Sequence, residues 1–165
     1  EVLKFDTNQI IDIPVQIWFC TNLEELDLRN NSITLLPREK GNMEILREIN
    51  IWDIGLETLT KLKTFRIDRN QLLMFPDEIG KLESLELLTA SRNRLSFLPE
   101  TIEGLAALKR LDLSMNSLSE LPETCFRKLT MLQDLDLSSN QIQKLPDDFG
   151  RLKSLRSLDI SKNEL

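Results

Sequence analysis

Apolar residues recur along this chain in one fixed order of spacings. The run "LEELDLRNNSITLLP", which begins at Leu23, follows the pattern L-x-x-L-x-L-x-x-N-x-I-x-x-L-P. The alternation L-x-L predicts a short strand whose leucines point to one face and whose polar residues point to the other. The pattern returns about every 23 residues, a period typical of a solenoid. Its units start near residues 1, 23, 46, 62, 85, 108, 132 and 155, of which the first and last are partial.

The apolar, Asn and Pro positions have separate structural roles. One coil cannot bury its own leucines, so neighbouring coils must stack to complete a core. The Asn after each strand is expected to bond backbone groups where the chain leaves the sheet, because an unsatisfied buried polar group costs about 1–3 kcal/mol. All six prolines occupy the slot at which the chain leaves the core. We therefore expect residues 1–165 to form a single solenoid domain.

The return segments "FPDEIGKL", "LPETIEGL" and "LPDDFGRL" follow the Asn and precede the next strand. With the repeated L-x-x-L-x-L-x-x-N core, they make the chain resemble a leucine-rich repeat protein over essentially its whole length. The return segments are most similar to the intracellular 23-residue class found in Ras-suppressor-type and Scribble-type scaffolds. The resemblance implies an α/β solenoid, a right-handed coil with a concave parallel β-sheet and a mostly irregular or short-helical convex side. It also implies protein binding as the function.

The composition excludes several classes of function. With 21 basic and 27 acidic residues, the net charge of -6 argues against a nucleic-acid partner, which needs a basic surface. The chain has no His and two Cys, so His-dependent nucleophiles, His-ligated zinc and four-thiolate metal sites are absent. A pair of carboxylates is formally able to act as acid and base, but most such pairs in an acidic chain are surface accidents. We expect no enzyme activity, no cofactor, no bound metal and no membrane span.

The two cysteines, Cys20 and Cys125, are predicted to be unpaired. They fall in return segments five predicted coils apart, and at about 4.8 Å per strand this separation is roughly 24 Å. A disulfide requires Cα atoms within about 7 Å. Buried free thiols fit a reducing compartment, and the cysteine-rich caps usual in secreted members of the resembled family are not visible. We therefore expect a cytoplasmic location.

Polar strand positions of successive units form stripes across the predicted concave face. Trp52, Leu87 and Met115 place apolar side chains on these stripes, at positions that the core does not require. Trp and Arg are enriched at binding hot spots and Met at interfaces, whereas an isolated surface charge usually contributes little. Guanidiniums around an apolar group suit a partner with an apolar anchor and nearby carboxylates. The predicted partner-binding residues are Trp52, Arg66, Arg69, Leu87, Arg92, Arg110 and Met115.

The last units present a different surface. Asp112, Asp134, Asp136 and Asp159 fall on neighbouring coils and form a predicted acidic strip. The strip is complementary to a basic patch, so we interpret it as a secondary contact surface. The alternative hypothesis is a metal site, because carboxylate oxygens bind hard cations. A solvated acidic face without function is the plainest alternative.

The unit that begins at Leu46 departs from the repeat. Its strand positions, which include Asn50 and the outward-facing Trp52, are kept, but the next unit starts at Leu62, so this unit is about 16 residues long. Three explanations remain open at this point. The return after Leu59 is truly short, residues after Leu59 are missing from the sequence, or the irregularity serves to present Trp52 to a partner.

For function, these observations favour a non-catalytic scaffold or adaptor in signalling that binds a protein on its concave face. By family resemblance, small GTPases or their regulators are candidate partners. A second hypothesis is the recognition region of a larger enzyme, such as a ubiquitin ligase, kinase or cyclase. A third is an effector or surface protein of a pathogen. Sequence patterns do not separate these hypotheses, because one repeat fold serves many partners.

Overall fold

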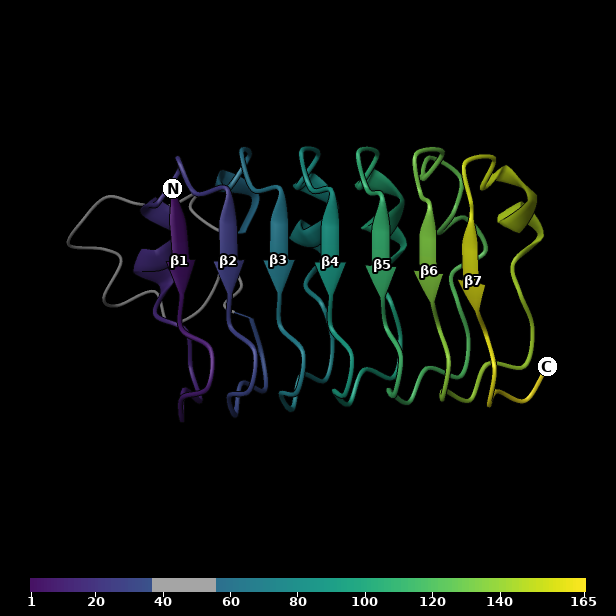
Figure 1. The fold of residues 1–165 in the computed structure, drawn as a ribbon, viewed down its shortest axis with the longest axis horizontal. Coiled ribbons are helices and arrows are strands. Elements are labelled where there is room, and N and C mark those ends of the chain that lie inside the picture. Colours follow the sequence, from purple (N-terminus) through teal and green to yellow (C-terminus); the bar gives the residue numbers. More distant parts are fainter. Residues whose placement is uncertain (37–55) are drawn as a thin grey trace.

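The computed structural model of this protein describes residues 1–36 and 56–165. In these residues seven strands of three residues each form one parallel sheet, in which the order of the strands follows the sequence. Figure 1 shows the strands side by side along the long axis of the molecule, with the two termini near opposite ends. The strands are β1 (Val2–Lys4), β2 (Glu25–Asp27), β3 (Thr64–Arg66), β4 (Leu87–Thr89), β5 (Arg110–Asp112), β6 (Asp134–Asp136) and β7 (Ser157–Asp159).

The middle residue of each strand points toward the core. Leu26 pairs with Phe65 in register, and both side chains are fully buried, whereas the residues on either side of them face outward or lie at the surface. The apolar residues that follow β2 to β6 are buried as well, so the coils share one continuous apolar core. The predicted alternation of buried and outward positions is thus confirmed for the solenoid.

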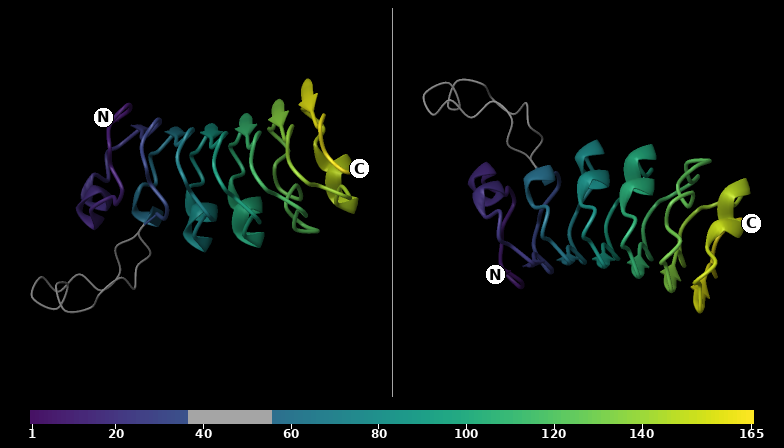
Figure 2. Two further views of the ribbon diagram at one scale, coloured as in Figure 1. Left: turned by 90° about the horizontal axis from the view of Figure 1, so that it is seen from below. Right: turned by 90° about the horizontal axis from the view of Figure 1, so that it is seen from above.

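The convex side consists of short 3₁₀ helices joined by turns. In Figure 2 these helices line the side of the molecule opposite to the strands, and the sheet is gently curved. A proline with φ between -64° and -71° immediately precedes four of the helices, because its fixed φ suits the entry to a helical turn. No helix in residues 1–36 and 56–165 is long and apolar enough to cross a membrane. The helices are η1 (Val15–Phe19), η2 (Leu56–Thr58), η3 (Asp77–Lys81), η4 (Glu100–Gly104) and η5 (Asp147–Arg151).

Two glycines allow η3 and η4 to approach closely. A Cβ atom at Gly80 would overlap the carbonyl oxygen of Thr101, and one at Gly104 would overlap the carbonyl oxygen of Gly80. These positions therefore exclude any side chain while the neighbouring backbone stays in place. The close packing of the two helices fixes the distance between the third and fourth coils on the convex side.

A ladder of asparagines holds the turns after the strands together. Asn70 is typical: its Nδ2 donates to the carbonyl oxygens of Leu28, Ile67 and Asp68, and its Oδ1 accepts the N–H of Ile33 in the preceding coil. These bonds satisfy backbone groups that have no partner in the sheet. Equivalent bonds are made by Asn31, Asn93, Asn116, Asn140 and Asn163, which confirms the structural role predicted for this position.

The second coil differs from the prediction. Strand β2 pairs directly with β3, with Glu25 opposite Thr64 and Asp27 opposite Arg66. The sheet therefore has no place for a strand between them, and the expectation that the unit beginning at Leu46 contributes a strand at this point of the sheet is wrong. The predicted strand of the unit at 46–61, including Trp52, lies outside the described residues.

Residues 56–62 form the return segment of this same coil. Leu56 and Leu59 are buried like Ile79 and Leu82, and both pairs stand three residues apart. The N–H of Leu62 donates to the carbonyl of Leu59, as a regular return requires. Helix η2 also joins the convex row, since the Thr58 hydroxyl donates to the carbonyl of Trp18 at 2.6 Å.

The chain therefore passes from Leu59 into β3 without a short or missing return, and the two explanations that placed the defect after Leu59 are wrong. The regular return could have been predicted from the sequence. The spacing Leu56-x-x-Leu59-x-x-Leu62 repeats that of Ile79, Leu82 and Leu85. The additional residues of the second coil precede Leu56.

Candidate functional site

A groove of about 550 Å³ lies on the strand face over β3, β4 and β5. Its walls include five of the seven residues predicted to bind a partner. Leu87 is half-buried and comes from the middle strand of the groove, β4. The groove brings together, from three coils, the predicted residues Arg66, Arg69, Leu87, Arg92 and Arg110.

The remaining two predicted residues do not line this groove. Met115 occupies the equivalent position one coil after Arg92 and is 44% exposed. Trp52 lies outside the described residues, so its predicted role in the site stays a prediction. Asp112 of the predicted acidic strip also lines the groove. The other lining residues, which were not predicted, are Arg29, Asn30, Asp68, Thr89 and Ser91.

Three of the predicted residues lie beyond the strands rather than in them. Arg69, Arg92 and Met115 have φ values of 54°, 55° and 55°, in the left-handed region. The same conformation recurs immediately before each Asn of the ladder, at Thr7, Asn30, Ser139 and Lys162. Non-glycine residues adopt it only where the surroundings fix the backbone, which here the Asn hydrogen bonds do. The prediction that these positions belong to strand stripes is corrected accordingly.

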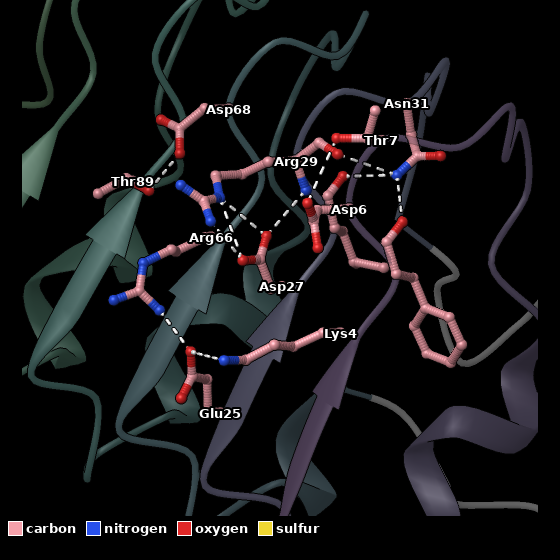
Figure 3. A network of polar contacts seen from close by, with 12 residues as sticks. Lys4, Asp6, Thr7, Glu25, Asp27, Arg29, Asn31, Arg66, Asp68 and Thr89 are labelled. Atoms are coloured by element: carbon pink, nitrogen blue, oxygen red, sulfur yellow. Dashed lines mark hydrogen bonds and ion pairs between the residues drawn. The ribbon is translucent and has the colours of Figure 1, made fainter.

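An ion-pair network occupies the groove's N-terminal wall, shown in Figure 3. Asp27 is buried and receives three hydrogen bonds from the Arg29 guanidinium, the shortest at 2.7 Å. Burial alone would raise the pKa of Asp27, but the bonds and charge of Arg29, with the charge of Arg66, hold it below its ordinary value. Arg66 in turn donates to Glu25 at 2.8 Å.

Sequence reasoning missed this network and named only Arg66 among the predicted partner-binding residues. Glu25 and Asp27 are one strand away from Arg66, a neighbourhood that the wrongly inserted unit at 46–61 hid. The spacing of Asp27 and Arg29 in the sequence was enough to predict their ion pair. Residues two apart in a strand lie on the same face, so Asp27 and Arg29 in "DLR" could have been paired from the sequence.

The predicted acidic strip lies on β5, β6 and β7. The register places Asp112 opposite Asp136 and Asp136 opposite Asp159, as the stripe order predicted. Asp134 is not free, because Arg110 donates to it at 3.1 Å. In residues 1–36 and 56–165 no group of three or more His, Cys, Asp or Glu side chains could hold a metal ion.

The carboxylates of the strip bond to the chain that follows them. Oδ1 of Asp112 accepts the N–H and the hydroxyl of Ser114, and Asp136 accepts the N–H of Ser138. Burial raises the pKa of Asp112, the bonds from Ser114 offset part of this rise, and the Asp136 carboxylate adds to it. Bonds from Ser161 lower the pKa of Asp159.

Both cysteines are free thiols, as predicted. Cys125 is buried and Cys20 is partly buried. They fall in the coils of β5 and β1, four coils apart rather than five. Burial raises the pKa of the Cys125 thiol, and the nearby Asp148 carboxylate adds to the rise. Cys125 is therefore held as an uncharged thiol, which does not act as a nucleophile.

Comparisons with known proteins agree with this geometry. A family model described as "Leucine rich repeat" matches residues 60–118 and 107–165, and a second model, "Leucine Rich Repeat", matches residues 22–43. A probable serine/threonine-protein kinase, pats1, from Dictyostelium discoideum is 32% identical over 98 residues, which are 52% of this chain and 3% of the kinase.

Solved structures give the same result. The Leptospira interrogans LRR protein LIC12759 superposes with a TM-score of 0.81 at 31% identity, covering 98% of this chain and 37% of that one. A second similar structure is the LRR ectodomain of the Arabidopsis thaliana receptor kinase GASSHO1/SCHENGEN3 in complex with CASPARIAN STRIP INTEGRITY FACTOR 2. It superposes with a TM-score of 0.80 at 32% identity, covering 98% of this chain and 18% of that one. This chain thus spans only a small part of the relatives it matches. Repeats of this kind are generally protein-interaction modules without catalytic activity. The chain belongs to the leucine-rich repeat family.

Proposed function

We propose that this chain is a non-catalytic protein-interaction module that binds a polypeptide partner in the groove over β3, β4 and β5. One observation carries the proposal: a half-buried leucine, Leu87, lies in a single groove with four arginines of the predicted site. No core position requires an apolar residue on this side of β4, since Leu88 already fills the core slot. Apolar groups surrounded by arginines are typical centres of protein interfaces.

The cellular role, the class of partner and the location are also part of the proposal. A scaffold or adaptor role in signalling, with a small GTPase or its regulator as partner, follows only from the resemblance to Ras-suppressor-type and Scribble-type repeats. The two free thiols favour a reducing compartment and hence the cytoplasm. Cytosolic lysate is therefore the first source of partners to test, and small GTPases and their regulators are the first candidates.

The test compares two faces of the protein by affinity capture from cytosolic lysate. A Leu87→Glu/Arg92→Glu variant alters the groove, and a Lys81→Glu/Met131→Glu variant alters the convex side, where both side chains are exposed. Circular dichroism melting confirms that both variants fold. The proposal predicts a partner that binds the wild type and the convex variant but is lost from the groove variant. Loss from the convex variant alone, or no specific partner of the wild type, would contradict it.

A second candidate is favoured by the kinase match. The matched residues are a small part of a much longer protein whose name describes a kinase. In this reading the chain is the recognition region of a larger enzyme, and the reaction takes place elsewhere in it. Sequencing the complete open reading frame tests this, because a catalytic domain encoded in the same frame would support it and its absence would exclude it.

A further inference from the structure

Three of the five arginines that line the groove are already neutralised by carboxylates of this chain. Arg29 binds Asp27 at 2.7 Å and Arg66 binds Glu25 at 2.8 Å. Arg110 binds Asp134 through two nitrogens at 3.1 Å. An anionic partner would have to break one of these pairs to reach the guanidinium, so these three arginines offer it little net attraction.

Arg69 and Arg92 differ from the other three. Both are exposed, and neither guanidinium has a hydrogen bond or an ion pair with any residue in 1–36 or 56–165. Two carboxylates, Asp68 and Asp112, line the same groove, and Asp68 accepts its hydrogen bonds from neutral groups. Its Oδ2 accepts the Thr89 hydroxyl, and its Oδ1 accepts the N–H and the hydroxyl of Ser91. Within the residues that the structure describes, these two guanidiniums of the groove thus have no ion-pair partner, and the Asp68 and Asp112 carboxylates of the same groove reduce the net positive charge around them.

The backbone presents these two cations from fixed points. Each residue has a left-handed φ, and its N–H donates to the carbonyl of the next coil, Arg69 to Ser91 and Arg92 to Ser114. The residues that follow them belong to the asparagine ladder. The two stems therefore start about one strand spacing apart, or roughly 4.8 Å, on backbone that loses little further freedom when a ligand binds.

Apolar surface borders the cation pair. Leu87 lies in the same groove. Met115 continues the left-handed row directly after Arg92 and is 44% exposed. A ligand that lies along this row meets two positive charges and then a flexible thioether, which adapts to apolar side chains of different shapes.

The charge of the remaining concave face limits the length and class of the ligand. Beyond β4 the same face carries Asp112, Asp136 and Asp159 on successive strands. A uniform polyanion such as a nucleic acid would run from the cation pair onto these carboxylates and be repelled, and the chain's net charge of -6 adds to this. A short acidic stretch that ends in an apolar residue does not reach Asp136 and Asp159, and of the strip only Asp112 lines the groove.

We propose that Arg69 and Arg92 are the recognition pair for a short acidic segment of a protein partner, whose carboxylates bind the two guanidiniums while a neighbouring apolar side chain packs against Leu87 and Met115. This inference rests on the proposed function, because it names the chemistry of the segment that occupies the groove. Charge-assisted bonds from guanidinium to carboxylate are the strongest polar contacts available to such a segment.

The test uses synthetic peptides and NMR titration of the ¹⁵N-labelled protein. The probe is a peptide with three consecutive acidic residues followed by leucine. One matched peptide replaces Glu and Asp by Gln and Asn, and an oligothymidylate of equal charge serves as the nucleic-acid probe. The variants are Arg69→Glu/Arg92→Glu and a control with the same charge change, Arg127→Glu/Lys153→Glu, whose side chains are exposed on the opposite side.

The proposal predicts that the acidic peptide shifts the amide resonances of Arg69, Leu87, Arg92 and Met115. Affinity should fall about tenfold or more in Arg69→Glu/Arg92→Glu, by no more than about twofold in the control, and steeply with added salt. The proposal is overturned if the amide peptide binds equally well, if both variants bind alike, if oligothymidylate binds more tightly, or if about 5 mM acidic peptide shifts nothing.

These outcomes are separable from failure of the proposed function. A captured partner that is lost from the Leu87→Glu/Arg92→Glu variant but retained fully by an Arg69→Gln/Arg92→Gln variant would place binding in the groove without an acidic segment. That result would overturn only the present inference. A partner lost from the convex variant alone would overturn both.

Discussion

The N-terminal and C-terminal halves of the concave face use the same strand slot for aspartate and treat the charge in opposite ways. In β2, Asp27 is followed two residues later by Arg29, which binds it. In β5, Asp112 is followed by Ser114, which supplies hydrogen bonds but no charge. The pKa of Asp27 accordingly lies below its ordinary value, and burial raises the pKa of Asp112 above it.

The comparison shows that the scaffold does not decide the electrostatics of the face. Both aspartates project from parallel strands of equal length, and the residue after the next leucine decides whether the carboxylate is neutralised. In the described residues the N-terminal half therefore contains a paired network and two arginines without an ion pair, Arg69 and Arg92, whereas the C-terminal half has a row of acids. The acidic segment that we propose for the partner would bind in the first half.

Replacing one asparagine of the ladder in each half should have the largest effect, and it tests whether the two halves have an equivalent scaffold. Asn70 in the third coil and Asn140 in the sixth are each 8% exposed, and each makes four hydrogen bonds to backbone groups. Replacing either by Ala leaves several buried groups without partners and should lower the free energy of unfolding by about 3 kcal/mol. Urea denaturation measures the free energy of unfolding of both variants. A difference of more than about 1.5 kcal/mol between them would break the equivalence.

A smaller effect separates the two aspartates. Asp27→Asn removes the charge from a buried side chain that receives three bonds from Arg29, and should lower the free energy of unfolding by about 2 kcal/mol. Asp112→Asn keeps an acceptor for Ser114 and removes an ion whose burial is unfavourable, so it should be neutral or raise stability by about 0.5 kcal/mol. Equal losses for the two variants, measured by the same denaturation, would refute the contrast between the halves.

The pH dependence of these two variants sharpens the same contrast. The lowered pKa of Asp27 stabilises the fold above the ordinary value of 3.8, and this contribution is lost as pH falls through the folded-state pKa. The raised pKa of Asp112 has the opposite sign, since the folded state takes up the proton first and stability is recovered as pH falls toward 3.8.

We therefore expect the advantage of Asp112→Asn over the wild type to shrink between about pH 7 and pH 4, while the deficit of Asp27→Asn persists there and disappears only at lower pH. Denaturation curves across this range, with Ser117→Ala as a control at an exposed position, measure both trends. Parallel curves for the two variants would contradict the assigned pKa directions.

Much of the fold was predictable because the repeat fixes it. The buried slots, the asparagine ladder and the convex turns follow from a spacing that the sequence repeats many times, and Leu26 or Asn70 could be placed without a structure. The direct pairing of β2 with β3 was not predictable, because Ile49, Ile51 and Ile54 have the sequence spacing expected of another strand between them. That one error separated Asp27 from Arg66, which are strand neighbours.

Five of the eleven residues that line the groove were among the predicted partner-binding residues, whereas the ion pairs that their side chains form were not predicted. Arg66, Arg69, Leu87, Arg92 and Arg110 were chosen by slot and do line one groove. Which arginines are free depends on side-chain reach across neighbouring coils, as in the bond from Arg110 to Asp134, and residue spacing does not determine it. The left-handed conformation at Arg69 and Arg92 likewise depends on hydrogen bonds between coils.

The most direct test of the account is site-specific photo-crosslinking in cytosolic lysate. A benzophenone amino acid replaces Leu87 in β4, Ser157 in the same slot of β7, or Met131 on the convex side. The account predicts one specific crosslinked partner from position 87 and none from positions 157 and 131. Crosslinking of a partner from position 157 or 131 without position 87 would contradict binding in the N-terminal half of the concave face.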